Sequence, residues 1–159
     1  MPKFKLDDID HQILDMLIDN TRVPFTDIAK KLLISAGTVH VRVKKMEDAG
    51  IIKGSSLTLD YQKLGYSFIA YVGIFLQNTS QTKFVLSRIN EIPFVTVAHI
   101  TTGKFNVFCK IRARNTLHAK EIIFQLDDID GVYRTETMIS LEESLNDKKR
   151  LMHSIFNEI

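Results

Sequence analysis

Apolar residues recur at helical spacing through the first fifty residues of the chain. A helix predicted over residues 7–20 is marked by Leu6, Ile9, Ile13, Leu14, Leu17 and Ile18. A second, short helix follows Pro24, and Ser35 is a suitable N-cap for a third helix that runs to about Ala49 and stops at Gly50. Because two of the three helices are joined by a tight turn, the pattern predicts a helix-turn-helix.

The third predicted helix has two different faces. At 100° per residue, one side carries Val39, Val43 and Met46, and the roughly opposite side carries Gly37, Val41, Lys44 and Lys45. The apolar Val41 among lysines would suit a thymine methyl group in a DNA major groove, although an ordinary exposed valine explains it too. Residues 51–60 are expected to form a short hairpin, or wing, broken at Gly54.

The second half of the chain alternates strand-like and helix-like patterns. Strands are predicted over 67–77, 95–100, 105–111 and 132–141, and helices over 82–92 and 117–126. An internal repeat supports this order, because Ile89, Ile92 and Val95 recur 37 residues later as Leu126, Ile129 and Val132. The order βαββαβ predicts a ferredoxin-like sheet with both helices on one face.

These patterns predict an α+β chain of two domains. Residues 1–60 would form a winged helix-turn-helix domain, a linker would cover about 61–66, and residues 67–145 would form the βαββαβ domain. The open face of that sheet needs a cover, and a second copy of the same sheet is the simplest one, so homodimerisation is predicted. The tail over 146–159 could be an amphipathic helix or a frayed end.

Charge is distributed unevenly, although the net formal charge of +2 is small. Between Ile28 and Met46 there is no acid, and this window holds Lys30, Lys31, Arg42, Lys44 and Lys45. Such a local excess suits a nucleic-acid partner, although a solvated basic face would look the same. With no signal-peptide pattern and no long apolar run, the chain is expected to be cytoplasmic and without a membrane partner.

Motifs for catalysis, cofactors and metals are missing from the sequence. There is no glycine-rich phosphate loop, no nucleophile elbow and no His-Glu-x-x-His helix, and the five histidines are scattered singly. Cys109 stands alone in an apolar run and is expected to be a buried, inert thiol. We therefore expect neither an enzyme nor a cofactor or metal site.

The order of motifs resembles the Lrp/AsnC family, the leucine-responsive and asparagine-responsive "feast/famine" transcription regulators. Its opening helix and recognition helix are matched by Leu6-Asp7, Asp10, Ile13-Leu14, Asn20-Thr21-Arg22, Ser35, Val39, Arg42, Val43, Met46, Glu47, Gly50 and Ile51-Ile52. Its second domain is matched by His99, Thr102-Gly103, Phe105, Lys110, Gly131-Val132, Thr135, Thr137 and Glu142-Glu143. The match covers residues 6 to about 145 in the right order.

The resemblance implies a regulator that binds double-stranded DNA as a dimer, assembles further, for example into an octamer, and senses an amino acid. The positions that match the family's DNA-binding residues are Ser35, Gly37, Thr38, His40, Val41, Arg42, Lys44 and Lys45. Since phosphate contacts position a protein and groove contacts specify sequence, Arg42 and the two lysines are expected to position, and Thr38, His40 and Val41 to read bases.

Three departures from the family pattern bear on function. Leu33 replaces the usual turn glycine and Ala36 the usual proline, and the loop that usually reads Gly-Asp-Phe/Tyr-Asp is here Gly103-Lys104-Phe105-Asn106. The expected effector site consists of Thr101, Thr102, Gly103, Lys104, Phe105 and Asn106, near an interface between dimers. With both carboxylates gone, amino-acid sensing would be weaker, altered or lost, and Lys104 would be available to a ligand carboxylate or would be a solvated turn residue.

Two function classes follow from the sequence. The first is a sequence-specific transcription regulator whose assembly or DNA affinity responds to a small effector. The second is a nucleoid-like architectural protein that binds DNA through backbone and shape, with the second domain serving only assembly. Specific binding exceeds non-specific binding by roughly 10³–10⁷, so the discrimination ratio separates the two classes.

Overall fold

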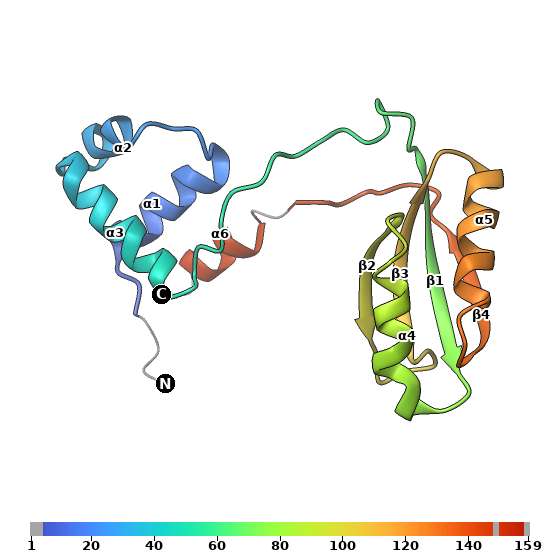
Figure 1. Cartoon of the computed structure of the whole chain (residues 1–159). Helices are drawn as coiled ribbons and strands as arrows, with labels where there is room; N and C mark the ends of the chain where they lie inside the picture. The colour runs from blue at the N-terminus through green and yellow to red at the C-terminus, as the bar shows by residue number, and fades with distance from the viewer. Residues whose placement is uncertain (1–4, 148–149, 158–159) are drawn as a thin grey trace. The chain divides into compact units, whose positions relative to one another are not determined.

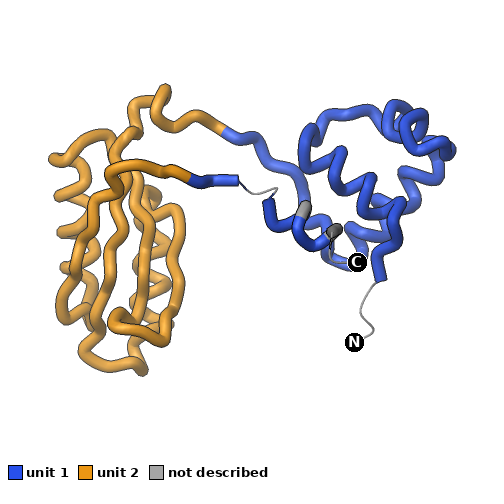
Figure 2. The backbone as a smooth tube through the Cα atoms, turned by 180° about the vertical axis from the view of Figure 1, so that it is seen from behind, with its two compact units in different colours: residues 1–58, 145–159 blue, residues 59–144 orange. Residues whose placement is uncertain are grey.

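The computed structural model describes residues 5–147 and 150–157, and it divides into two compact units (Figures 1 and 2). The first unit takes in the chain up to Thr58 together with the segment from Leu145 onward. The second unit spans Leu59–Ser144. Among the described residues, no helix is long and apolar enough to cross a membrane.

In the described part of the first unit the chain forms four helices. They are α1 (Asp8–Asp19), α2 (Phe25–Leu32), α3 (Ala36–Asp48) and α6 (Arg150–Asn157). Their common core is made of Ile13, Leu14, Ile28, Ala29, Val39, Val43 and Met46. The three predicted N-terminal helices are confirmed to within about a residue at each end, and the tail forms a helix over 150–157 rather than a frayed end.

The turn between α2 and α3 uses a left-handed residue without being glycine. Leu33 caps α2 with φ +55° and ψ +38°, and its N–H bonds back to Ala29 and Lys30 carbonyls. Among the described residues no other non-glycine has a positive φ. The side chain of Leu33 is 92% exposed, so the residue gains almost no burial for adopting a conformation that disfavours branched side chains.

The predicted hairpin over 51–60 is wrong. Gly50, at φ +71°, ends α3, and the N–H groups of Ile51 and Ile52 both bond to the carbonyl of Met46. The chain beyond them carries no strand before Phe68. Ile52 packs on the helical core, whereas Leu57 and Leu59 are exposed. The alternating apolar residues that suggested strands therefore do not share a common buried face.

A four-stranded antiparallel sheet forms the second unit, with strand order β2-β3-β1-β4. Its elements are β1 (Phe68–Leu76), the 3₁₀ turn η1 (Thr79–Gln81), α4 (Thr82–Ile89), β2 (Val95–Ile100), β3 (Val107–Ala113), α5 (Thr116–Asp127) and β4 (Val132–Ile139). This confirms the predicted βαββαβ order. The bounds of two elements differ from the prediction: α4 ends at Ile89 rather than at residue 92, and β3 starts two residues later than predicted.

Strand alternation separates the two faces of the sheet. Along β3, Val107, Cys109, Ile111 and Ala113 are buried, and they join Ala70, Val72 and Ile74 of β1 in a core covered by α4 and α5. Cys109 is fully buried, and this burial raises the pKa of its thiol to about 11, which keeps it protonated and unreactive. Within the second unit, whose residues 59–144 are all described, neither helix packs on the opposite face of the sheet.

Candidate DNA interface and effector loop

The recognition helix α3 starts at a well-defined cap. The Ser35 hydroxyl accepts a hydrogen bond from the Thr38 N–H at 3.0 Å and lies 2.8 Å from the Thr38 hydroxyl. This is the predicted N-cap, and it satisfies one of the free N–H groups at the helix start. Ala36, in place of proline, is compatible with the cap because α3 begins at that residue.

Exposed side chains follow α3 on the side away from its core contacts. Val39, Val43 and Met46 are buried, whereas the predicted DNA contacts Gly37, Thr38, His40, Val41, Lys44 and Lys45 are all exposed. A hollow beside the helix is lined by Lys5, Asp7, Asp10, Ser35, Gly37, Thr38, Val41, Arg42 and Lys45. Val41 is 52% exposed, so the faces assigned by helical periodicity are confirmed.

The residues predicted to contact DNA lie on two different sides of α3. Thr38, Val41 and Lys45 line the hollow together, one turn apart. His40 and Lys44 do not line it: the His40 ring lies 6.1 Å from the ring of Phe25, and the Lys44 ammonium is paired with Asp48 at 2.9 Å. The hydrogen bond to Asp48 raises the pKa of Lys44. The structure therefore singles out Thr38, Val41 and Lys45 as the continuous stripe.

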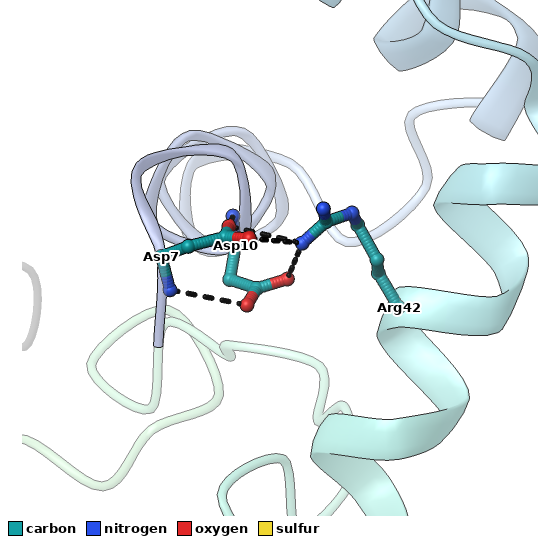
Figure 3. A network of polar contacts seen from close by, with 3 residues as sticks. All are labelled: Asp7, Asp10 and Arg42. Atoms are coloured by element: carbon teal, nitrogen blue, oxygen red, sulfur yellow. Dashed lines mark hydrogen bonds and ion pairs between the residues drawn. The ribbon is translucent and has the colours of Figure 1, made fainter. Parts of the chain in front are cut away.

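Arg42 is engaged inside the protein (Figure 3). Its Nη1 donates to both carboxylate oxygens of Asp7, at 2.8 and 2.9 Å, and to the Asp10 carboxylate at 2.7 Å. Asp7 is the N-cap of α1, and Asp7 and Asp10 form a reciprocal capping box. The guanidinium thus joins α3 to the start of α1, and the contact of Arg42 with DNA phosphate stays a prediction.

Electrostatics in this cluster favour the charged forms of Asp7 and Arg42. The backbone N–H of Asp10, followed by the Arg42 guanidinium, lowers the pKa of the Asp7 carboxyl. Hydrogen bonds to Asp10 and then Asp7 raise the pKa of Arg42. The side chain of Asp10 is only 8% exposed, so the cation beside it compensates the burial of its charge. We call Asp7, Asp10 and Arg42 the helix clamp.

The predicted effector loop is fastened to the sheet by its own hydrogen bonds. The N–H of Thr101 bonds to the Asn106 carbonyl at 3.1 Å, and the Thr101 hydroxyl donates to the Phe105 carbonyl. Asn106 donates its N–H to Ile74 and accepts from the Leu76 N–H through its Oδ1 at 2.9 Å. The neutral oxygen that replaces a family carboxylate therefore holds the loop against β1.

Lys104 is also occupied within its own chain. Its ammonium lies 2.5 Å from the Glu136 carboxylate on β4, and 5.2 Å and 5.8 Å from the ring centres of Phe105 and Phe75. Glu136 also pairs with Arg134 at 3.1 Å. The predicted free lysine is thus part of an ion-pair cluster, although 61% of its side chain is exposed. A ligand carboxylate would have to compete with Glu136.

Aromatic rings line the uncovered face of the sheet. Tyr71 stacks on Phe108 at 5.8 Å, Phe108 lies 5.7 Å from Phe105, and Phe105 meets Phe75 edge-on at 5.2 Å. The Phe105 ring can lie there only because residue 73 is glycine: a Cβ at Gly73 would come within 2.3 Å of that ring. We call Tyr71, Phe75, Phe105 and Phe108 the aromatic row.

Sequence reasoning overlooked Asp7, Asp10 and Glu136 as parts of these sites. Asp7 and Asp10 lie at the start of α1, but their partner Arg42 is more than thirty positions away along the chain. Glu136 belongs to β4, and its partner Lys104 lies in the loop between β2 and β3. In the described part of the chain, no group of three or more His, Cys, Asp and Glu side chains could hold a metal ion.

An exposed helix in a helix-turn-helix, followed by a βαββαβ sheet, defines the class of two-domain DNA-binding regulators. Residues 6–53 match the winged helix-turn-helix DNA-binding family, and residues 69–149 match the Lrp/AsnC ligand-binding domain. The chain belongs to the Lrp/AsnC family.

Relatives of similar length support this assignment. The regulatory protein AsnC of Haemophilus influenzae is 33% identical over 141 residues, which are 88% of this chain and 94% of that protein. The solved structure of Escherichia coli AsnC has a TM-score of 0.87 at 31% identity, covering 91% of this chain and 97% of that one. A Mycobacterium tuberculosis feast or famine regulatory protein, solved with L-methionine, shares the fold with a TM-score of 0.82 at 23% identity, covering 91% and 97% of the two chains.

Proposed function

We propose that the protein is a sequence-specific DNA-binding transcription regulator that reads DNA with the stripe Thr38, Val41 and Lys45. The observation that carries this proposal is the exposure of that stripe on a helix whose other side is buried in the core and whose position is fixed by the helix clamp. A rigidly held helix with a short polar residue, a methyl-bearing residue and a cation on one side suits a major groove.

Within this interface the residues have different tasks. Thr38 and Val41 contact base edges, and Lys45 contacts phosphate. Ser35 and Gly37 line the same hollow as the stripe, and the exposed His40 and Lys44 extend the contact surface on the neighbouring side of α3. Arg42 is a positioning residue that acts through Asp7 and Asp10. This role places the protein in the cytoplasm and requires no enzymatic activity.

The test compares cognate with random DNA for three variants of the full chain. Val41→Ser should reduce the preference for cognate DNA by about 1–3 kcal/mol, because it removes an apolar base contact. Lys45→Ala should weaken binding to both DNAs and reduce the salt slope by about one unit. Lys63→Ala, which changes an exposed lysine of the second unit, is the control. Equal losses on both DNAs for Val41→Ser would contradict base reading, and no discrimination by the wild type would favour the architectural role.

The aromatic row is proposed as the face on which two copies associate. Four half-buried rings with charged neighbours gather on a face that neither helix of the second unit covers, so a partner there would remove their remaining apolar surface from water. A second copy of the sheet would cover this area, as the strand pattern also predicts. Further assembly to an octamer would add contacts between such dimers.

An amino acid is the proposed effector of the loop over 101–106. The L-methionine bound in a family relative of the same fold supports this ligand class. In this chain the ligand carboxylate would displace Glu136 from Lys104, while Asn106 keeps the loop shape through Leu76. Light-scattering mass with pools of amino acids tests the proposal. Glu136→Gln should increase the response, Lys104→Met should abolish it, and a mass indifferent to every pool in all three proteins would contradict it.

A further inference from the structure

A helix from the far end of the chain packs on the DNA-binding helices. α6 contacts α1, and Met152 lies half-buried against the core formed by α1, α2 and α3. The segment from Leu145 onward therefore groups with the N-terminal helices, as the shared colour in Figure 2 shows. The first unit is therefore completed by a segment that follows the second unit in the sequence.

Neither family match accounts for α6. The helix-turn-helix match ends at residue 53 and the ligand-binding match at residue 149, whereas α6 starts at Arg150. An eight-residue helix is too short to be stable alone in water, so its folding depends on docking. Leu151, Ser154 and Ile155 are exposed, whereas Met152 is half-buried against the helical core and is a side chain through which α6 docks.

The helix that α6 contacts is also the helix that holds α3. Asp7 caps α1, Asp10 lies in its first turn, and both bind Arg42 of α3. A displacement of α1 would therefore shift the recognition helix α3 as well, because the helix clamp joins the two helices. We propose that α6 is a C-terminal clasp: docked through Met152, it holds α1 where the helix clamp fixes α3, and when undocked it loosens α1 and weakens DNA binding. The DNA-binding part of this inference rests on the proposed function.

Hydrogen exchange of the full-length protein tests the clasp with two variants that add the same charge to the same helix. Met152→Asp should undock α6, and the amides of α1 should then exchange roughly tenfold faster, which corresponds to about 1.4 kcal/mol. Ser154→Asp, on the exposed side, should leave α1 as in the wild type. The amides of β1 and β3 should be unchanged in both variants. In DNA titrations, only Met152→Asp should raise Kd, by several-fold.

Each result either supports the clasp or overturns it. Equal α1 exchange in Met152→Asp and Ser154→Asp would overturn the docking, and faster exchange with no change in Kd would overturn the link to DNA binding. Met152→Ala removes the side chain without adding charge and should shift exchange in the same direction by a smaller factor if the aspartate variant fails to fold. Because exchange is measured without DNA, a failure of the proposed function would appear separately, as a wild type that does not discriminate between DNAs.

Discussion

At the scale of single residues, one guanidinium determines how the recognition helix is held. Arg42 reaches three carboxylate oxygens through a single nitrogen, and one of its partners is almost fully buried. Removing the cation would leave the Asp10 carboxylate without its charged partner in a poorly solvated place. The expected cost is therefore larger than that of a surface ion pair.

Arg42→Met should lower the free energy of unfolding by about 2 kcal/mol, because hydrogen bonds to charged groups contribute about 1.5–3 kcal/mol. Arg42→Lys keeps a cation and should lose less. Urea denaturation measures both, and Lys44→Met is the control, since its pair with Asp48 is exposed and should contribute less than about 1 kcal/mol. A cost for Arg42→Met as small as that of the control would show that the clamp is not structural.

Acid should release part of this stabilisation through Asp7. Its pKa is lower in the folded protein than its ordinary value of 3.8, so the folded state favours the ionised form. The stabilisation is complete at neutral pH and is lost as the pH falls below about 4 through the folded pKa. Thermal unfolding between pH 6 and pH 3 should show a shallower pH dependence for Asp7→Asn, because asparagine caps α1 without a charge. Parallel curves for both proteins would contradict a role for this carboxylate.

Sequence reasoning at this scale identified the exposed side of α3 but did not foresee the intrachain partners of two charged residues. Periodicity places Val41 and Lys45 outside because the faces of α3 follow from a fixed rotation per residue. The ion pairs of Arg42 with Asp7 and of Lys104 with Glu136 were not foreseen because the partners are distant in sequence. Local spacing carries no information on which acid an arginine or lysine will meet after folding.

At the scale of elements, the two helices of the helix-turn-helix are joined by a strained residue. Leu33 has a left-handed conformation and an exposed side chain, so its packing does not offset the strain. Leu33→Asn should stabilise the protein by about 0.5–1 kcal/mol, since asparagine tolerates this conformation with little penalty. Leu33→Val should destabilise it, because branching at Cβ increases the clash. Equal melting temperatures for the three proteins would show that the turn relaxes to a different conformation.

The position of the predicted effector loop on the sheet depends on Gly73 of β1. Gly73→Ala would place a methyl group 2.3 Å from the Phe105 ring, so the ring and its loop must move, and overpacking of this kind costs about 1–3 kcal/mol. The cost should shrink in a Phe105→Ala background, where the ring is absent. Denaturation of the two single variants and the double variant measures this coupling. Additive effects would mean that the ring does not lie on residue 73.

The order of helices and strands was easier to predict from the sequence than which segments would pair with one another. Helices and strands with clear periods appeared where expected, because burial of one face selects the period. The wing did not form, since Ile51 to Asp60 has alternating apolar residues but no neighbouring strand to pair with. Pairing is a non-local property, and a short apolar alternation cannot report it.

At the scale of the whole molecule, the chain crosses between its two units twice. It leaves the DNA-binding unit after Thr58, builds the sheet and returns at Leu145. The repeat of the βαβ pattern predicted the sheet, the order βαββαβ along the chain and the open face of the sheet, because two copies of one motif bury their apolar sides together. The return of α6 to the first unit was not predictable, since an amphipathic tail does not identify the surface it will cover.

The proposed association through the aromatic row is tested at the scale of the whole molecule. Phe108→Asp would put a charge in the middle of the row, where a second copy would have to bury it, so the variant should elute as a monomer of 18.2 kDa in light-scattering chromatography. The wild type should elute at twice this mass or a multiple of it. Phe84→Asp is the matched control, since Phe84 is an exposed aromatic on α4, on the covered side of the sheet. If both variants kept the wild-type mass, another surface would join the copies; if the wild type were monomeric, the aromatic row would have to serve a different partner.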